Sequence, residues 1–259
     1  MVTPRWAVGH VGVTGPVFDD IVVAAGVGFE LENADVRADR PRVPMAIFDL
    51  DRTILRGSSL PTVAKALVDA GLLRRQVLVS ALVRNAIFRR SGCGDDAVTG
   101  LVGQVLGLVA GMEASRVRAA LESVQFDLLA GSRPELRQLI ADHRAAGDLC
   151  VVLTASPIEV AELVAFGLGA HCGIGTRSEV VDGRYTGQLV GPVCYGRAKV
   201  ESLDTAPVRP FWASSTAYSD AASDLPLLRA VGRAVVVCPD RQLRREAAAS
   251  GWRTLTVER

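Results

Sequence analysis

The chain has 259 residues, of which 49% are hydrophobic and 22% are charged, so it can bury a sizeable core and is not disordered throughout. Its 29 basic residues against 28 acidic ones give a net charge of +1, which argues against a nucleic-acid binder because such proteins need a basic excess to neutralise phosphates. The longest apolar helical stretch, Leu72 to Phe88, is interrupted by three arginines and is not expected to span a membrane.

The first 43 residues differ from the rest because they carry no sustained helical or strand period. We expect residues 1–43 to be an extension, poorly ordered or loosely attached, rather than a functional arm. The regular pattern that starts at residue 44 predicts an α/β core formed by residues 44–56 and 131–259. Residues 57–130 are then expected to form a helical cap.

The first predicted strand is Met45 to Phe48, an uninterrupted apolar run typical of a parallel strand buried on both faces. The next such strand, Cys150 to Leu153, follows after a long interval. Ser132 to Glu135 has the Ser-x-x-Glu form of a capping box and predicts a helix that runs to about Ala146. The interval before it holds four helical patterns, Leu60–Ala70, Leu72–Arg90, Asp96–Ala110 and Glu113–Leu129.

Shorter elements follow the second strand. The patterns predict a helix over Pro157–Phe166 that stops at Gly167, and a hairpin over Val180–Leu189 that turns at Asp182 and Gly183. Later elements are a helix (Gly196–Leu203), a strand (Trp212–Tyr218), a helix (Ala222–Ala230), a strand (Ala234–Cys238) and a helix (Arg241–Ala249). This alternation predicts an α/β fold, a Rossmann-like three-layer core around a parallel sheet. The long helical interval is then an inserted all-helical cap over the carboxyl edge of the sheet, where such folds bind ligands.

The five cysteines are scattered and form no CxxC pair, and the three histidines are isolated from one another. This pattern indicates neither a disulfide framework nor a zinc site. No apolar leader with a cleavage site opens the chain, so the cytoplasm is the expected compartment.

Two acids, Asp49 and Asp51, follow the first strand at positions i and i+2. Side chains at this spacing on an extended segment point the same way, and two close carboxylates are costly unless a cation lies between them or one is protonated. Mg²⁺ would resolve the repulsion because it favours a few carboxylates together with phosphate oxygens. One acid can then act as a nucleophile and the other as a proton donor. The alternative for this motif alone is a polar strand end.

Hydroxyls and a lysine provide chemistry that fits a phosphate. Thr154 and Ser156 follow the second strand just before a predicted helix N-terminus, which attracts anions; the alternative is that either hydroxyl simply caps the helix. Lys199 is the only lysine besides Lys65. It fits a compact charge near carboxylates and phosphate, or alternatively a solvated helix residue.

Asp220 and Asp224 follow the predicted strand that ends at Tyr218. Their i, i+4 spacing places both on one face at the start of a helix. The alternatives are helix capping by Asp220 and complementation of the helix dipole by Asp224.

In order and spacing, these motifs resemble the haloacid dehalogenase-like phosphatase superfamily. The resemblance covers residues 44–259. Within the superfamily, the chain is most similar to the phosphoserine-phosphatase-like branch. The features that indicate this branch are the helical insertion directly after the first motif and the segments 181–187 and 218–226. The matches are DxDxT at Asp49, Asp51 and Thr53, the hydroxyl motif at Thr154, the lysine motif at Lys199, and DxxxD at Asp220 and Asp224.

The resemblance implies a role for each residue. Asp49 would attack phosphorus and carry an aspartyl-phosphate, while Asp51 would protonate the leaving alcohol and then deprotonate the hydrolytic water. Thr154, Ala155 and Lys199 would hold the phosphate oxygens.

The same resemblance implies a Mg²⁺ site. The ion would be bound by Asp49, by the main-chain carbonyl of Asp51 and by Asp220, with Asp224 supporting its waters or Lys199. An acid at position 51 favours a phosphatase or phosphomutase, since the dehalogenases and transport ATPases of the superfamily lack it.

The expected activity is therefore Mg²⁺-dependent hydrolysis of a small anionic organic phosphate monoester. Phosphoserine phosphatases of this branch usually carry a glutamate nine residues after the nucleophile, where this chain has Ser58, so serine recognition is not implied. The alternatives are a phosphomutase-like phosphotransferase and a catalytically silent phosphate-binding or interaction module.

The predicted cap also contains a basic segment, Lys65 to Arg90, with six basic side chains against the single acid Asp69. We expect this segment to pack within the cap or at a dimer contact; the alternative is contact with an anionic membrane surface. The expected partner is a small phosphorylated metabolite and not a nucleic acid, and the expected state is a monomer or homodimer.

Overall fold

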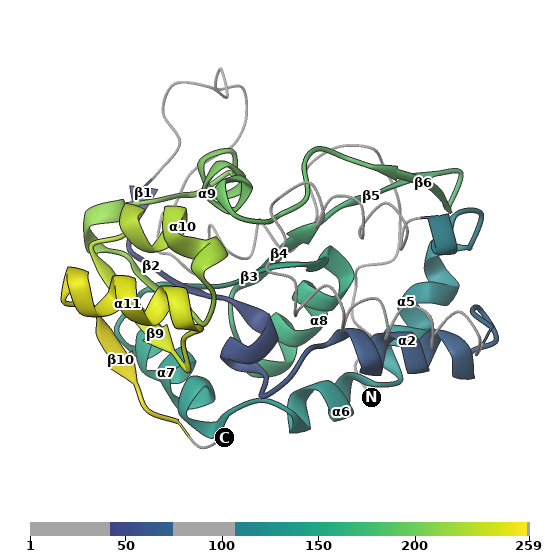
Figure 1. Ribbon diagram of the computed structural model, residues 1–259. Coiled ribbons are helices and arrows are strands. Elements are labelled where there is room, and N and C mark those ends of the chain that lie inside the picture. The colour runs from purple at the N-terminus through teal and green to yellow at the C-terminus, as the bar shows by residue number, and fades with distance from the viewer. Residues whose placement is uncertain (1–41, 75–106, 258–259) are drawn as a thin grey trace.

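The fold is built around a parallel sheet. A computed structural model describes residues 42–74 and 107–257, and its central sheet has six strands in the order β10-β9-β8-β2-β3-β4 (Figure 1). Every pairing in this sheet is parallel. Because the chain proceeds from β2 outward on both sides, the carboxyl ends of β3, β2 and β8 meet at one edge, at a topological switch point. The strands are β2 (Met45–Phe48), β3 (Leu149–Pro157), β4 (Cys172–Thr176), β8 (Thr216–Ser219), β9 (Arg233–Val237) and β10 (Arg253–Leu255).

The side chains of the strands alternate between two buried layers. In β2, Ala46 and Phe48 belong to one apolar cluster, whereas Met45 and Ile47 belong to the other. Helices α7 (Pro134–Ala145) and α8 (Ile158–Leu168) contribute to the first layer. Helices α9 (Arg197–Asp204), α10 (Leu225–Ala230) and α11 (Arg241–Ser250) contribute to the second. The predicted α/β fold with a parallel sheet between helical layers is confirmed.

The interval between β2 and β3 is helical where the structure describes it. After a short irregular loop, η1 (Leu50–Ile54), it contains α2 (Leu60–Asp69), α5 (Ala114–Glu122) and α6 (Gln125–Ala130). The helix predicted over Glu113–Leu129 is therefore two helices, because the backbone leaves the helical region at Val124, where φ is −111° and ψ is 10°. Most of the helices predicted over Leu72–Arg90 and Asp96–Ala110 lies outside the described residues, as do residues 1–41.

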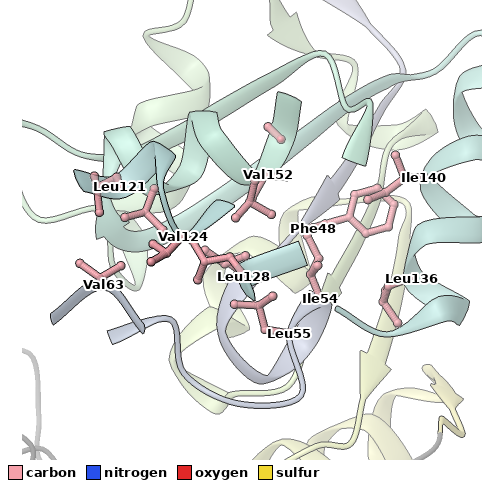
Figure 2. Close-up of a cluster of buried hydrophobic side chains, with 14 of the residues drawn as sticks. Phe48, Ile54, Leu55, Val63, Leu121, Val124, Leu128, Leu136, Ile140 and Val152 are labelled. Atoms are coloured by element: carbon pink, nitrogen blue, oxygen red, sulfur yellow. The ribbon is translucent and has the colours of Figure 1, made fainter. Parts of the chain in front are cut away.

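These inserted helices share a continuous core with the sheet. Figure 2 shows side chains that extend from Phe48 and Val152 on the sheet, past Leu128 on α6, to Val63 on α2 and Leu121 on α5. Burial of this common apolar surface fixes the insertion against the core. In the described parts of the chain, the inserted helices and the sheet therefore do not have separate apolar cores on this side of the sheet. The predicted boundaries between core and cap stay predictions.

The predicted capping box at the start of α7 is wrong. The helix begins at Pro134, and its N-cap is Arg133, whose side chain makes no capping hydrogen bond. The hydroxyl of Ser132 instead donates to the carbonyl of Leu129 at 2.6 Å.

The predicted end of α8 at Gly167 is also wrong. The helix continues to Leu168 and ends at Gly169, which has the left-handed φ of 72° favoured after a helix. Gly167 serves close packing instead, because a Cβ at this position would lie 2.6 Å from Cδ1 of Leu129.

The predicted hairpin is confirmed. Strands β5 (Ser178–Val181) and β6 (Arg184–Leu189) pair antiparallel, and Asp182 and Gly183 have φ values of 49° and 74°, as a tight two-residue turn requires. An ion pair of 2.6 Å between Arg184 and Glu113 connects this hairpin to the start of α5.

Other differences concern short elements. The strand predicted from Trp212 starts at Thr216, after the turn η2 (Trp212–Ser214), and α10 is preceded by the turn η3 (Ala222–Asp224). Strands β4 and β10 were not predicted, since β4 contains two glycines and β10 has three residues. Two-residue strands β1 (Arg42–Val43) and β7 (Arg209–Pro210) form a separate parallel pair.

Over the described parts of the chain, we find no helix with the length and apolar character needed to cross a bilayer.

Gly173 in β4 is expected to be intolerant of a side chain. A Cβ there would lie 2.3 Å from the main-chain carbon of Ala161 in α8, so Gly173→Ala must push the helix off the strand. We expect a loss of about 1–3 kcal/mol in the free energy of unfolding, measured by urea denaturation. Gly57→Ala is the control because no atom lies within 4 Å of its Cβ position; equal stabilities of the two variants would contradict this packing.

Candidate active site

The predicted site residues come from neighbouring strands of the sheet. Asp49 directly follows β2, Thr154 lies near the end of β3, and Asp220 directly follows β8. Because these strands are parallel neighbours, their carboxyl ends bring the three residues to one edge.

Lys199 on α9 connects two of the predicted acids. Its ammonium contacts Oδ1 of Asp49 and Oδ2 of Asp224, each at 2.7 Å, and the hydroxyl of Ser219 donates to the same Asp224 oxygen at 2.8 Å. Burial of Lys199 acts to lower its pKa, but the carboxylates of Asp224 and Asp49 outweigh burial and raise the pKa. Lys199 is 2% exposed and is therefore a buried, permanently charged group rather than a solvated helix residue.

Asp220 is held from the side of the DxDxT segment. Nε of Arg52 lies 3.1 Å from Oδ2 of Asp220, and the hydroxyl of Thr53 donates to Oδ1 at 3.4 Å. Arg52 can reach this carboxylate from a loop in which its own backbone has a left-handed φ of 67°. Burial, and then the charge of Asp49, raise the pKa of Asp220 to about 7, although Arg52 acts to lower it.

Acidic side chains outnumber basic ones at this edge of the sheet. Burial raises the pKa of Asp49 to about 6, and the charges of Asp224 and Asp51 add to the rise while Lys199 opposes it. The cluster thus contains the carboxyl groups of four aspartates, whereas Lys199 and Arg52 are its contacting cations. A further cation would relieve the repulsion between the buried carboxylates.

The donor set fits a magnesium ion. Within residues 42–74 and 107–257, no three acidic, histidine or cysteine side chains gather closely enough to enclose a metal by themselves. Mg²⁺, however, keeps several waters and needs only one or two protein carboxylates, which Asp49 and Asp220 can supply. Lys199 occupies Oδ1 of Asp49, and no hydrogen bond in the described parts of the chain occupies its Oδ2.

Asp51 is anchored separately from Asp49. Its Oδ1 accepts the main-chain N–H of Ser59, and its Oδ2 accepts the hydroxyl of Ser156 at 3.0 Å. Since both carboxylate oxygens are engaged in this way, the side chain has one defined orientation.

Thr154 and Ala155 lie beside this anchor. Thr154 is buried, and its hydroxyl oxygen accepts the main-chain N–H of Ser156 at 3.1 Å, while the carbonyl of Ala155 accepts the Thr176 hydroxyl at 2.8 Å. Neither Thr154 nor Ser156 caps α8, whose N-cap is Pro157 without a side-chain hydrogen bond. The phosphate contacts expected of Thr154 and Ala155 stay predictions.

The structure adds residues to which sequence analysis assigned no role. Arg52, Ser59 and Ser219 contact the predicted acids directly. Arg52 lies inside the DxDxT motif and Ser219 immediately precedes Asp220. Their proximity to these motifs in the sequence could have indicated that they contact the acids. The hydroxyl oxygen of Ser58 accepts the main-chain N–H of Leu60 at the start of α2, at 3.3 Å.

Comparison with known families identifies the chain. Residues 46–229 match the haloacid dehalogenase-like hydrolase family. The protein belongs to this family. That membership and the predicted phosphoserine-phosphatase-like branch are both confirmed, because the motifs from Asp49 to Asp224 lie within the matched residues and a 31% identical relative is named as a phosphoserine phosphatase.

Individual relatives cover most of the chain. It is 36% identical over 217 residues to "Probable phosphatase Rv3661" of Mycobacterium tuberculosis, a match spanning 83% of this chain and 75% of that protein. It is 31% identical over 212 residues to phosphoserine phosphatase SerB1 of the same organism, spanning 80% and 68%. A crystal structure of a protein with unknown function from Bordetella pertussis Tohama I superposes with a TM-score of 0.70 and 28% identity, over 83% and 99% of the two chains.

The raised pKa of Asp220 predicts how the metal-free protein responds to pH. A carboxyl whose pKa is higher in the folded than in the unfolded state contributes stability below its unfolded pKa, near 3.8, and loses it as the pH rises through about 7. Asp220→Asn removes this loss, so the variant should gain stability relative to the wild type between about pH 5 and pH 8, by at most about 3 kcal/mol.

This response can be measured by denaturant unfolding in EDTA at both pH values. Asp69→Asn is the matched control, because Asp69 lies on the exposed face of α2. A stability difference between Asp220→Asn and wild type that is the same at both pH values would contradict the raised pKa.

Proposed function

We propose that the protein is a Mg²⁺-dependent phosphomonoesterase that hydrolyses a small anionic organic phosphate through an aspartyl-phosphate on Asp49. The observation that carries this proposal is the contact of buried Lys199 with Asp49 and Asp224 at the carboxyl edge, beside Asp220. Membership of a hydrolase family and a 36% identical relative named as a phosphatase support it.

The proposed reaction assigns a separate task to each side chain. One carboxylate oxygen of Asp49 attacks phosphorus, which leaves the other for the cations, and Lys199 neutralises charge that develops on the phosphoryl oxygens. Asp51 gives a proton to the leaving oxygen, then takes one from the water that hydrolyses the aspartyl-phosphate.

Asp49, Asp220 and the main-chain carbonyl of Asp51 would hold Mg²⁺, and Asp224 would keep Lys199 in place. When bound, the ion supplies positive charge that offsets the charge of the phosphoryl group.

The proposed substrate is an anionic phosphate because Lys199 and the proposed Mg²⁺ would bind its negative charge. Ser58 does not indicate which alcohol the phosphate is attached to. A monoester of a small alcohol fits the proposal. Phosphoserine is one candidate, because a relative is named phosphoserine phosphatase. Ser58 offers a hydroxyl already engaged at the start of α2 instead of a carboxylate that would bind an ammonium group. We therefore expect no strong preference for phosphoserine over other small anionic monoesters. A cytoplasmic location and a monomeric or homodimeric state belong to the same proposal.

The test is turnover of p-nitrophenyl phosphate by purified protein with Mg²⁺ and with EDTA, followed by a panel of phosphoserine, sugar phosphates and lysophosphatidate. Metal-dependent release of inorganic phosphate is expected. Transfer of the phosphoryl group to a second sugar hydroxyl would instead indicate a phosphomutase-like phosphotransferase, and absence of turnover would indicate a silent binding module. A robust preference for phosphoserine would contradict the interpretation of Ser58.

A further inference from the structure

The carboxyl group of Asp51 has an asymmetric environment. At Oδ1 it meets the main-chain N–H of Ser59, and at Oδ2 it meets the side-chain hydroxyl of Ser156 at 3.0 Å. An N–H can only donate, whereas a hydroxyl can donate or accept. A proton on Oδ1 would therefore weaken the hydrogen bond that Oδ1 accepts and would find no acceptor in Ser59 N–H, whereas a proton on Oδ2 can be donated to the Ser156 hydroxyl.

The hydroxyl of Ser156 has a second partner of the same kind. Its Oγ lies 3.1 Å from Oγ of Ser59, and either oxygen can be the donor. Ser59 is 2% exposed, so its hydroxyl is sheltered from exchange with bulk water. The pair can reverse its direction together: Ser156 donates to the Asp51 carboxylate in one state and accepts from the carboxylic acid in the other.

These three side chains come from distant parts of the sequence. Asp51 lies in η1, Ser59 is the N-cap of α2, and Ser156 lies at the end of β3. The contact thus links the loop that carries the acid both to the sheet and to the first inserted helix.

We propose that the Ser59–Ser156 hydroxyl pair positions Asp51 for proton transfer and assigns the transferable proton to its Oδ2. This inference rests on the proposed phosphatase activity. As the bond between phosphorus and the leaving oxygen breaks and Asp49 bonds to phosphorus, the O–H at Oδ2 gives up its hydrogen bond to Ser156 and transfers its proton to the leaving oxygen. Asp51 becomes a carboxylate, which Ser156 then stabilises by donating its hydroxyl hydrogen. In the second step the water oxygen bonds to phosphorus, the bond between phosphorus and Asp49 breaks, and inorganic phosphate and the Asp49 carboxylate are released. The Asp51 carboxylate takes the proton from the attacking water, and the pair reverses again.

Leaving groups of different basicity distinguish this role from a structural one. A nitrophenolate departs with little help from an acid, whereas an alkoxide needs the proton. We expect Ser156→Ala to lower kcat/KM for glycerol phosphate about tenfold or more beyond its effect on p-nitrophenyl phosphate, since positioned acids typically contribute about 10²–10⁴-fold. Ser59→Ala keeps the N–H contact and should give a smaller effect in the same direction. Ser156→Thr, which retains a hydroxyl, should restore most of the loss.

Matched controls make the outcome decisive. Ser123→Ala removes a hydroxyl that donates to the Ala120 carbonyl on α5 and should change neither substrate. Equal losses on both substrates with Ser156→Ala, or no loss, would overturn the proposal, and failure of Ser59→Ala to show the leaving-group dependence would count against the paired arrangement. Lack of p-nitrophenyl phosphate turnover by the wild type would refute the proposed function instead, so the two failures are separable.

Discussion

Replacement of Asp49 by asparagine is expected to lower kcat for p-nitrophenyl phosphate by about 10⁴-fold or more, the scale seen when a nucleophile is removed. The amide keeps the size of the side chain but cannot form the acyl phosphate. Asp49 is 8% exposed and its pKa is raised to about 6, with burial as the main cause, so loss of its charge should not destabilise the fold.

The matched control is Asp69→Asn, which changes an exposed aspartate paired with Lys65 on α2 and should retain wild-type turnover. Thermal melting of all three proteins verifies that they are folded. Activity of Asp49→Asn within tenfold of the wild type would contradict a nucleophilic role.

Replacement of Lys199 by methionine is expected to damage both stability and activity. It leaves the carboxylates of Asp49 and Asp224 buried without the cation that contacts both at 2.7 Å. Breaking a buried ion pair from one side typically costs about 3–5 kcal/mol. The loss should be larger at pH 8 than near pH 5, because the buried carboxyl of Asp49 can take up a proton at the lower pH. Phosphatase activity should fall below detection.

The other lysine provides the control. Lys65 forms an exposed i, i+4 pair with Asp69, and such pairs contribute little, so Lys65→Met should leave both the melting temperature and turnover unchanged. Equal effects of the two substitutions in chemical denaturation would show that Lys199 is not the buried structural cation described here.

Much of the fold could be predicted because its signals are local. The apolar run Met45–Phe48 and the turn at Asp182 and Gly183 predict their elements from backbone and burial preferences alone. The end of α8 could not be predicted, because Gly167 is explained by the packing of Leu129 from a helix far away in sequence. The capping box failed for a related reason: the Ser132 hydroxyl finds a carbonyl partner in the preceding helix.

The candidate site divides in the same way. Because Asp49, Thr154 and Asp220 each lie at the end of a predicted strand of a parallel sheet, the sequence predicts that they share its carboxyl edge, and the structure places them there. The contacts of Arg52 with Asp220 and of Ser156 with Asp51 could not be predicted from the sequence, because they depend on a left-handed loop residue and on the relative placement of β3 and η1. Periodicity carries no information about either.

The most direct test of the account is to locate the phosphoryl group on the protein during turnover. Acid quenching of the wild type with Mg²⁺ and substrate, followed by peptide mass mapping, should find one phosphoryl group on the peptide containing Asp49, and an Asp51→Asn variant should retain it longer. A phosphoryl group on another residue, or full turnover with no phosphorylated peptide under the same quench, would contradict nucleophilic catalysis by Asp49.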